Sequence, residues 1–536
     1  MNDVRPIENL YAAAWKSALV EAVATTVRSP DPKEAAEQAT MVDATTKGVA
    51  KYCDALNNGE AINPHPGGPE GPAQNSDPEI AAYLAQLHHR AAHNKCTIND
   101  PQVASDIKLE LDRFHFGNPL WQQMSQQYFA NYALYPFHKA TPPMYRAWND
   151  YNGGGGDADF GVIAWRLPAN ARVAIVGDVG TGTDIAAATL ISVLSFKPHA
   201  ILHVGDVYFS GTQFEFEHRL VNMLKQVMHA ADQQVPFFTL PGNHEYFTGN
   251  VPYFSCLDSG VLTPLPEQRQ RASYFSLMTA DDGWQFLGMD TGYYGHYLAI
   301  TDEQQRTALK LLHGQNPRVS ADLPIQKLPP NTDMVLLRDD EVQWHRRRMN
   351  SFAGETVLLS HHPLYSQALP CGVEPVALAN GSPDPSDINR VGIDTAIWRQ
   401  LGRYFGDKVS AWFWGHEHNL AIYKDNYRPS DWPNTREIET LFRALPKGRC
   451  VGHSAIPVTV AENPYAGRYP VPLIANTQLG ATAGWYNHGF EILQLAGAGR
   501  PARTYYYQIV DVDPTPILIY EEDIGERADA MQRGTV

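Results

Sequence analysis

Cysteine is scarce in this chain: five cysteines are scattered over 536 residues, and none forms a CxxC pair. An odd, dispersed set of this kind is typical of reduced thiols and argues against a disulfide framework or a thiolate metal cluster. Long apolar runs are also missing, since no window approaches the roughly eighteen apolar residues of a membrane-spanning helix. The N-terminus, MNDVRPIENLYAAAW, lacks the pattern of a secretory signal. We therefore expect a cytoplasmic protein without a membrane-spanning segment.

Basic residues are outnumbered by acidic ones: 42 Lys and Arg stand against 58 Asp and Glu, and the formal net charge is −16. Polyanion partners require basic faces, so we expect no nucleic acid polymer as a partner. A small phosphorylated substrate is compatible with this charge, provided that a local positive centre such as a metal site receives the phosphate. The sequence does not indicate the oligomeric state.

The chain changes character near residue 150. Helical spacing with many alanines predicts a helical N-terminal region over residues 1–148, and the glycine-rich stretch 149–159 is typical of a flexible connection. Over 160–520, short β-rich runs alternate with helical patterns, which predicts an α/β domain with parallel strands. Proline-rich stretches predict surface inserts near 314–331, 370–390 and 426–472.

Five successive apolar runs end in polar residues of the kinds that bind metals. In chain order, these residues are Asp178, Asp206, the pair Asn243 and His244, His361, and the pair His416 and His418. Because ligands collect at the carboxyl ends of strands in α/β sheets, we expect these side chains to converge on one point. A mixed set of carboxylate, amide and imidazole ligands suits Mn, Fe or Zn.

The first of these runs, VAIVGDVGTGTD (173–184), has a second interpretation, because a glycine-rich turn after a strand can cradle a phosphate. A P-loop needs GxxxxGK[ST], and no lysine follows Gly182. A dinucleotide-binding turn needs GxGxxG, and Ile185 stands at its last glycine position. We therefore expect the glycines to allow a sharp turn and Asp178 to carry the chemistry.

The order GD, GD, GNHE, HxP, GHxH resembles the calcineurin-like metallophosphoesterase superfamily, and GDxG at 177–180 resembles its purple-acid-phosphatase-like branch. The resemblance covers roughly 170–425, with the last strands after 470, and leaves residues 1–150 unexplained. It implies an α/β fold in which a two-sheet β sandwich is flanked by helices. It also implies a binuclear centre of two divalent or mixed-valence ions of Mn, Fe or Zn.

The same resemblance implies a role for each residue. Asp206 would bridge both ions, which lie roughly 3.5–4 Å apart in such sites. Asp178 and His418 would hold the first ion, and the second would be held by Asn243, His361 and His416. A hydroxide between the ions would be the nucleophile. His244 would face the leaving group as general acid or hydrogen-bond donor.

One ligand of the first ion departs from the family pattern. Calcineurin-type members have a histidine where Gly180 stands, and purple acid phosphatases use the tyrosine of GDxxY. In GDVYF that place is Phe209, and the tyrosine, Tyr208, comes one residue early. Because a one-residue step in a strand turns a side chain to the other face, two alternatives stay open. Either the turn is remodelled so that Tyr208 reaches the metal, or the first site is one ligand short.

The resemblance implies metal-dependent hydrolysis of a phosphate ester, and GDxG slightly favours a phosphomonoesterase. A phosphodiesterase acting on nucleotides is the nearest alternative, because this superfamily hosts both on one metal centre. A different class of function is a catalytically weak metal-binding domain whose helical N-terminal region recruits a protein partner. The incomplete first site motivates this last alternative.

Overall fold

The computed structural model describes residues 143–525, except for short gaps and one longer one at 209–210, 212, 247–248, 296–334, 378–382, 406–407, 426–434, 446, 483 and 511. The predicted helical region 1–148 lies outside the described residues except for its last six, and the predicted insert 314–331 lies outside them entirely. Among the described residues, no helix is both long and apolar enough to cross a membrane.

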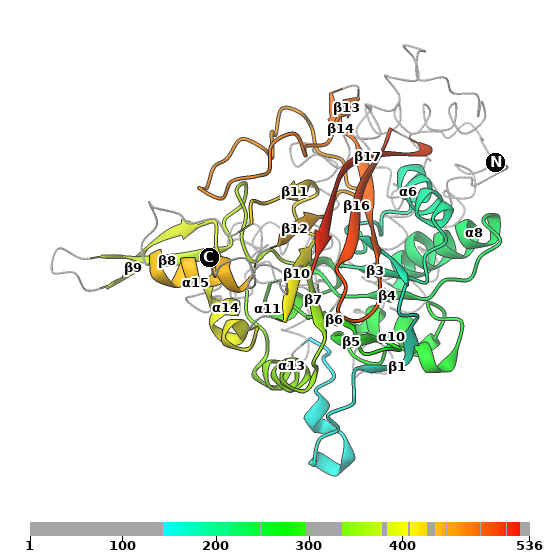
Figure 1. Ribbon diagram of the computed structural model, residues 1–536, viewed down its shortest axis with the longest axis horizontal. Helices are drawn as coiled ribbons and strands as arrows, with labels where there is room; N and C mark the ends of the chain where they lie inside the picture. Colours follow the sequence, from blue (N-terminus) through cyan, green and yellow to red (C-terminus); the bar gives the residue numbers. More distant parts are fainter. Residues whose placement is uncertain are drawn as a thin grey trace, which may run out of the picture.

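Two large sheets form the centre of the domain (Figure 1). The seven-stranded sheet has the order β1 (Val162–Leu167), β5 (Phe275–Thr279), β6 (Trp284–Gly288), β7 (Glu355–Ser360), β10 (Val409–Trp414), β12 (Gly448–Val451) and β11 (Leu420–Ile422). The six-stranded sheet has the order β17 (Asp513–Ile524), β16 (Ala502–Val510), β15 (His488–Gln494), β2 (Arg172–Val176), β3 (Ala200–His203) and β4 (Phe237–Thr239). Strands β2, β3 and β4 are parallel, as are β6, β7, β10 and β12.

The two sheets pack face to face through a shared apolar core. Val173 and Ile175 of β2 lie in the same buried cluster as Val357 of β7 and Phe413 of β10. The alternate residues of β2, Ala174 and Val176, point to the opposite face and pack against helices. Both faces of these strands are therefore covered, which explains why they appear in the sequence as continuous apolar runs.

Helices cover the outer face of each sheet. The six-stranded sheet is covered by α6 (Asp184–Ser195), α8 (Met223–Ala230) and α10 (Val251–Ser259), and the seven-stranded sheet by α13 (Asp339–Ser351), α14 (Thr395–Leu401) and α15 (Thr435–Ala444). Figure 1 shows the strands between these two sets of helices. The predicted two-sheet sandwich flanked by helices is thereby confirmed.

Shorter elements complete the description. They are the 3-10 turns η2 (Trp148–Asp150), η3 (Asn152–Gly154), η5 (Pro266–Gln268) and η7 (Gly402–Tyr404), helices α7 (Gln213–Glu215), α9 (Asn243–Tyr246) and α11 (Gly292–Gly295), the π-helical η4 (Phe216–Asn222), and strands β8 (Gly372–Ala377), β9 (Pro383–Val391), β13 (Ala481–Thr482) and β14 (Trp485–Tyr486). Part of the predicted surface insert 426–472 lies within a sheet instead, because all four residues of β12 are buried. Within the predicted insert 370–390, β8 and β9 pair as an antiparallel hairpin.

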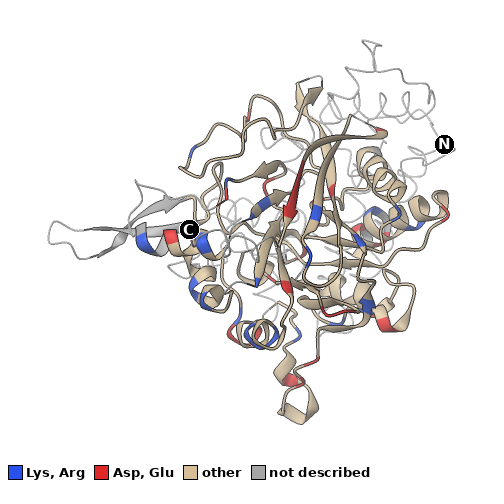
Figure 2. Ribbon diagram, viewed as in Figure 1, with Lys and Arg blue, Asp and Glu red and all other residues tan. Residues whose placement is uncertain are grey.

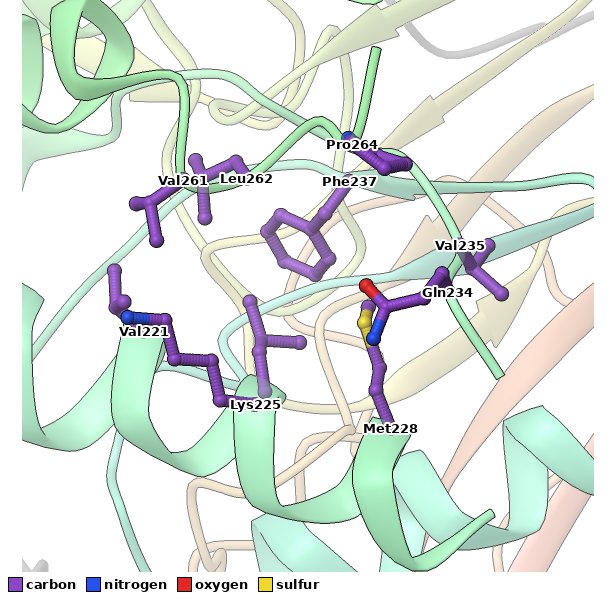
Figure 3. A pocket seen from close by; sticks show the side chains of 10 residues that line it. Val221, Lys225, Met228, Gln234, Val235, Phe237, Val261, Leu262 and Pro264 are labelled. Atoms are coloured by element: carbon purple, nitrogen blue, oxygen red, sulfur yellow. The ribbon is translucent and has the colours of Figure 1, made fainter. Parts of the chain in front are cut away.

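A cavity of about 160 Å³ lies between α8 and the amino end of β4 (Figure 3). Its lining is mostly apolar and includes Leu224, Met228 and Phe237. The predicted metal-binding residues follow the carboxyl ends of the strands, so this cavity belongs to the helix packing and not to the predicted site.

A buried ion pair joins the two sheets. Arg449 of β12 donates from Nε and Nη2 to the two carboxylate oxygens of Glu522 in β17, both at 2.7 Å. Tyr506 donates to the same carboxylate at 2.7 Å, and Lys447 lies 3.0 Å from it. Burial alone would raise the pKa of Glu522, but Arg449 and Lys447 lower it to about 2. The ion pair therefore stays charged inside the fold and links β12 of one sheet to β17 of the other.

Glu522→Gln should destabilise the protein by about 1–3 kcal/mol, because Arg449 loses its buried carboxylate partner and keeps only the half-buried Asp425 at 2.9 Å. The measurement is denaturant unfolding followed by tryptophan fluorescence. Glu521→Gln is the matched control, since the neighbouring Glu521 pairs with Arg503 at 2.7 Å on the exposed face and should matter little. Equal effects of the two substitutions would refute the structural role of the buried pair.

Candidate metal centre

Each predicted ligand lies just beyond the carboxyl end of a strand. Asp178 follows β2, Asp206 follows β3, and Asn243 follows β4, all in the six-stranded sheet; His361 follows β7, and His416 and His418 follow β10, in the seven-stranded sheet. The sandwich thus brings ligands from both sheets to one edge. Asp178, Asp206 and His361 are buried, and they offer ligand atoms within 4.8 Å of one another.

His361 is at the centre of the half of the cluster predicted for the second ion. Its Nε2 lies 3.2 Å from each of three atoms: Asp206 Oδ2, Asn243 Oδ1 and His416 Nδ1. Its Nδ1 lies 2.9 Å from the carbonyl oxygen of Val204, which can only accept, so Nδ1 carries a hydrogen. This contact leaves the Nε2 lone pair of the neutral ring facing the cluster, as metal-binding histidines require.

The half of the cluster predicted for the first ion contains Tyr208. Its hydroxyl lies 2.6 Å from Asp178 Oδ1, 2.9 Å from Asp206 Oδ2 and 3.0 Å from His418 Nε2. His418 Nε2 is itself 3.4 Å from Asp178 Oδ1. The structure therefore places the Tyr208 hydroxyl among the predicted ligands, as the alternative with a remodelled turn requires.

The turn is remodelled by close contact between two loops. The N–H of Tyr208 donates to the Gly180 carbonyl at 2.9 Å, and Gly180 forms a parallel bridge with Val207. A Cβ at position 180 would lie 2.7 Å from the carbonyl oxygen of Asp206, so any larger residue would separate the loops. The glycine found in place of a histidine thus admits the segment that carries Tyr208. Phe209, the alternative position, lies outside the described residues.

Four of the predicted ligands have left-handed backbone conformations. The φ angles are 62° for Asp178, 76° for Asp206, 70° for His416 and 51° for His418. Such conformations cost of the order of 1–3 kcal/mol for residues other than glycine and concentrate at functional sites. The surrounding sandwich compensates for this cost, which indicates that the side-chain directions at this cluster are functionally constrained.

Glycines allow the carboxylates to lie directly against the neighbouring backbone. A Cβ at Gly242 would collide with Asp206 Oδ1, and a Cβ at Gly415 would lie 2.5 Å from Asp178 Oδ2. The backbone N–H of His416 also donates to Asp178 Oδ2 at 3.0 Å. One oxygen of each carboxylate is therefore held by the backbone, and the other faces the cluster.

The charges in the cluster fit a bound cation. Burial alone would raise the pKa of Asp206, but His361 and His244 hold it well below its usual range. Burial alone would lower the pKa of His361, and Asp206 and Asp178 raise it to about 9. Burial, together with the nearby His361, lowers the pKa of His416 to about 3. A proton on His361 thus lies among oxygen and nitrogen atoms that accept hydrogen bonds. The same carboxylate, amide and imidazole groups are suitable ligands for a Mn, Fe or Zn ion in place of that proton.

His244 lies at the edge of the cluster. Its Nε2 is 3.7 Å from Asp206 Oδ2, and its side chain is 14% exposed. Its ring lies 4.5 Å from the ring of Tyr208. The predicted ligand His418 is exposed to a similar degree, at 20%, whereas Asp178, Asp206 and His361 are buried. The exposure of His244 leaves its imidazole accessible to a substrate from outside.

Two neighbours of the cluster did not stand out in the sequence. His362 is buried, and its ligand atom lies within 4.8 Å of those of His361 and His416; the HH pair is the only signal for it. Ser454 accepts from the N–H of Gly177 at 3.2 Å and so ties the loop after β12 to the one that carries Asp178. No motif marks Ser454, because its role is a backbone contact.

Comparisons with known proteins agree with this geometry. The model of the calcineurin-like phosphoesterase family matches residues 171–420, which include all the predicted ligands. The chain is also similar to uncharacterized protein L509 of Acanthamoeba polyphaga mimivirus, with 23% identity over 198 residues. That alignment spans 35% of this chain and 62% of the viral protein. Residues 171–420 of this chain form a calcineurin-like phosphoesterase domain.

Proposed function

We propose that this protein hydrolyses a phosphate ester with a binuclear metal centre. A calcineurin-like phosphoesterase domain supports metal-dependent phosphoester hydrolysis in general. The observation that carries the finer proposal is the donor cluster at the edge of the sandwich. Asp206 serves as the shared ligand, since Oδ2 lies within 3.2 Å of both Tyr208 in one half and His361 in the other.

The ligands divide between two positions. Asp178, His418 and the hydroxyl of Tyr208 would hold the first ion, and Asn243, His361 and His416 would hold the second. When bound, two such ions supply an activated water at neutral pH and neutralise the charge on the phosphoryl oxygens. In this proposal Tyr208 would take the place left by Gly180, and the first site would not be one ligand short.

His244 acts on the leaving group. A general acid must reach both the reacting centre and a substrate that enters from solvent. The partial exposure of His244 and its 3.7 Å distance from Asp206 meet both conditions. The imidazole donates a proton or a hydrogen bond to the departing ester oxygen.

The substrate is a small phosphorylated molecule, a monoester in preference to a diester, and the protein is cytoplasmic. The net charge of −16 weighs against a nucleic acid polymer. Helix α13 carries charges of both signs and is not uniformly basic: Asp339 and Glu341 lie in its first turn and Arg348 in its last (Figure 2).

The ester class is tested by comparing the hydrolysis of p-nitrophenyl phosphate with that of bis(p-nitrophenyl) phosphate. A preference of tenfold or more for the diester would overturn the monoesterase assignment.

Asp206→Asn should reduce phosphatase activity by at least about 10³-fold, because a weaker donor replaces the ligand shared by both ions. Bound metal should also fall from about two equivalents to one or fewer. The measurements are elemental analysis and p-nitrophenyl phosphate turnover on one preparation. Asp258→Asn is the control, since Asp258 is 59% exposed and pairs with Arg146. Unchanged activity in Asp206→Asn would mean that the hydrolysis comes from a contaminant.

His244→Ala should lower turnover of an alkyl phosphate by about 10²–10⁴-fold, because a poor leaving group needs the proton. Turnover of p-nitrophenyl phosphate should fall much less, since p-nitrophenolate leaves readily without one. Metal content should stay at the wild-type value, which elemental analysis checks. An equal loss on both substrates would contradict the assignment of His244 as general acid.

A further inference from the structure

Arg219 is a buried cation near the metal cluster that no motif explains. It lies on η4, a π-helical segment between α7 and α8, and its side chain is 3% exposed. Its Nη1 donates to the carbonyl oxygen of Tyr208 at 2.6 Å and lies 3.2 Å from Oε1 of the fully buried Glu215. π-Helical turns are rare and occur frequently at functional sites.

The backbone of Tyr208 is held on both sides. Its N–H donates to the Gly180 carbonyl at 2.9 Å, and its carbonyl accepts from Arg219. A charge-assisted hydrogen bond is shorter and stronger than a neutral one. The phenol ring is fully buried, and its hydroxyl contacts Asp178, Asp206 and His418. These contacts fix the two peptide units on either side of the Tyr208 Cα, and their orientation determines whether the hydroxyl reaches the cluster.

Arg219 also packs against the other loop of the first site. A Cβ at Gly182 would lie 2.8 Å from Arg219 Cγ, and Gly182 has a φ of 67°. The loop after β2, which carries Asp178, thus closes directly onto the Arg219 side chain. Through Gly182 and Tyr208, one arginine contacts two of the three loops that supply ligands to the first site, those after β2 and β3.

We propose that Arg219 is the positioning residue that holds Tyr208 in the first metal site. It does so by fixing the Tyr208 carbonyl from one side while Gly180 fixes the N–H from the other. This inference rests on the proposed function of Tyr208 as a ligand. It explains how a tyrosine one residue earlier than in GDxxY presents its hydroxyl to the same cluster.

A double-mutant cycle tests this proposal on metal binding alone. Mn²⁺ affinity is measured by calorimetry on the metal-free full-length wild type, Tyr208→Phe, Arg219→Met and the double variant. We expect each single variant to bind one of the two Mn²⁺ ions about tenfold or more weakly than the wild type does. The double variant should be no weaker than Tyr208→Phe, because Arg219 acts through the tyrosine. Arg219→Lys, which keeps a donor and the charge facing Glu215, should recover part of the affinity.

Thermal unfolding of every variant separates positioning from general stability. Arg219→Met removes the cation that lies 3.2 Å from the buried Glu215. Arg219→Met combined with Glu215→Gln is therefore a second variant that removes both charges, and it should still lose the Mn²⁺ affinity. Additive losses in the cycle would overturn the proposal, since Arg219 would then act on the fold and not through Tyr208. Unchanged affinity in Arg219→Met or in Tyr208→Phe would overturn it as well. Failure of the proposed hydrolysis is distinct: it is the absence of turnover in a protein that binds two ions.

Discussion

The geometry of the candidate metal centre depends on burying two carboxylates at one point. Asp178 is fully buried and Asp206 is 1% exposed, and they share the cluster with imidazoles and an amide. Removing an unpaired carboxylate from water costs several kcal/mol, so the cluster requires positive charge. Protons on the histidines meet this requirement only in part, because His416 is held neutral by burial. The oxygen and nitrogen donors together suit divalent cations.

The sandwich supplies the rigidity that such a cluster needs. The ligands follow strands of both sheets, and the Arg449–Glu522 pair fixes one sheet against the other. The left-handed φ angles at Asp178 and Asp206 aim the carboxylates, and Gly242 and Gly415 let them approach the backbone. Positioning by strand ends is more precise than positioning by long loops, which suits chemistry that tolerates errors of only about 0.5 Å.

The sequence predicted the fold class and the convergence at the strand ends, because both follow from local patterns. A buried strand is a continuous apolar run, and a residue such as Asp206 stands out directly after it. Tyr208 could not be decided in this way, since its direction depends on a backbone contact with Gly180 across 28 positions of sequence. Arg219 and Ser454 carry no signal at all, because each acts on a backbone group of a distant segment. β12 was expected in a surface insert, since the proline-rich residues around it mask a strand of four residues.

The most direct test of the central claim is the number of metal ions bound per chain. The purified full-length protein is stripped of metal, supplied with an excess of Mn, Fe or Zn, freed of unbound ions and subjected to elemental analysis. A binuclear centre predicts about two equivalents per chain, bound together with the appearance of phosphatase activity. One equivalent or fewer at saturation, without turnover, would contradict the binuclear centre.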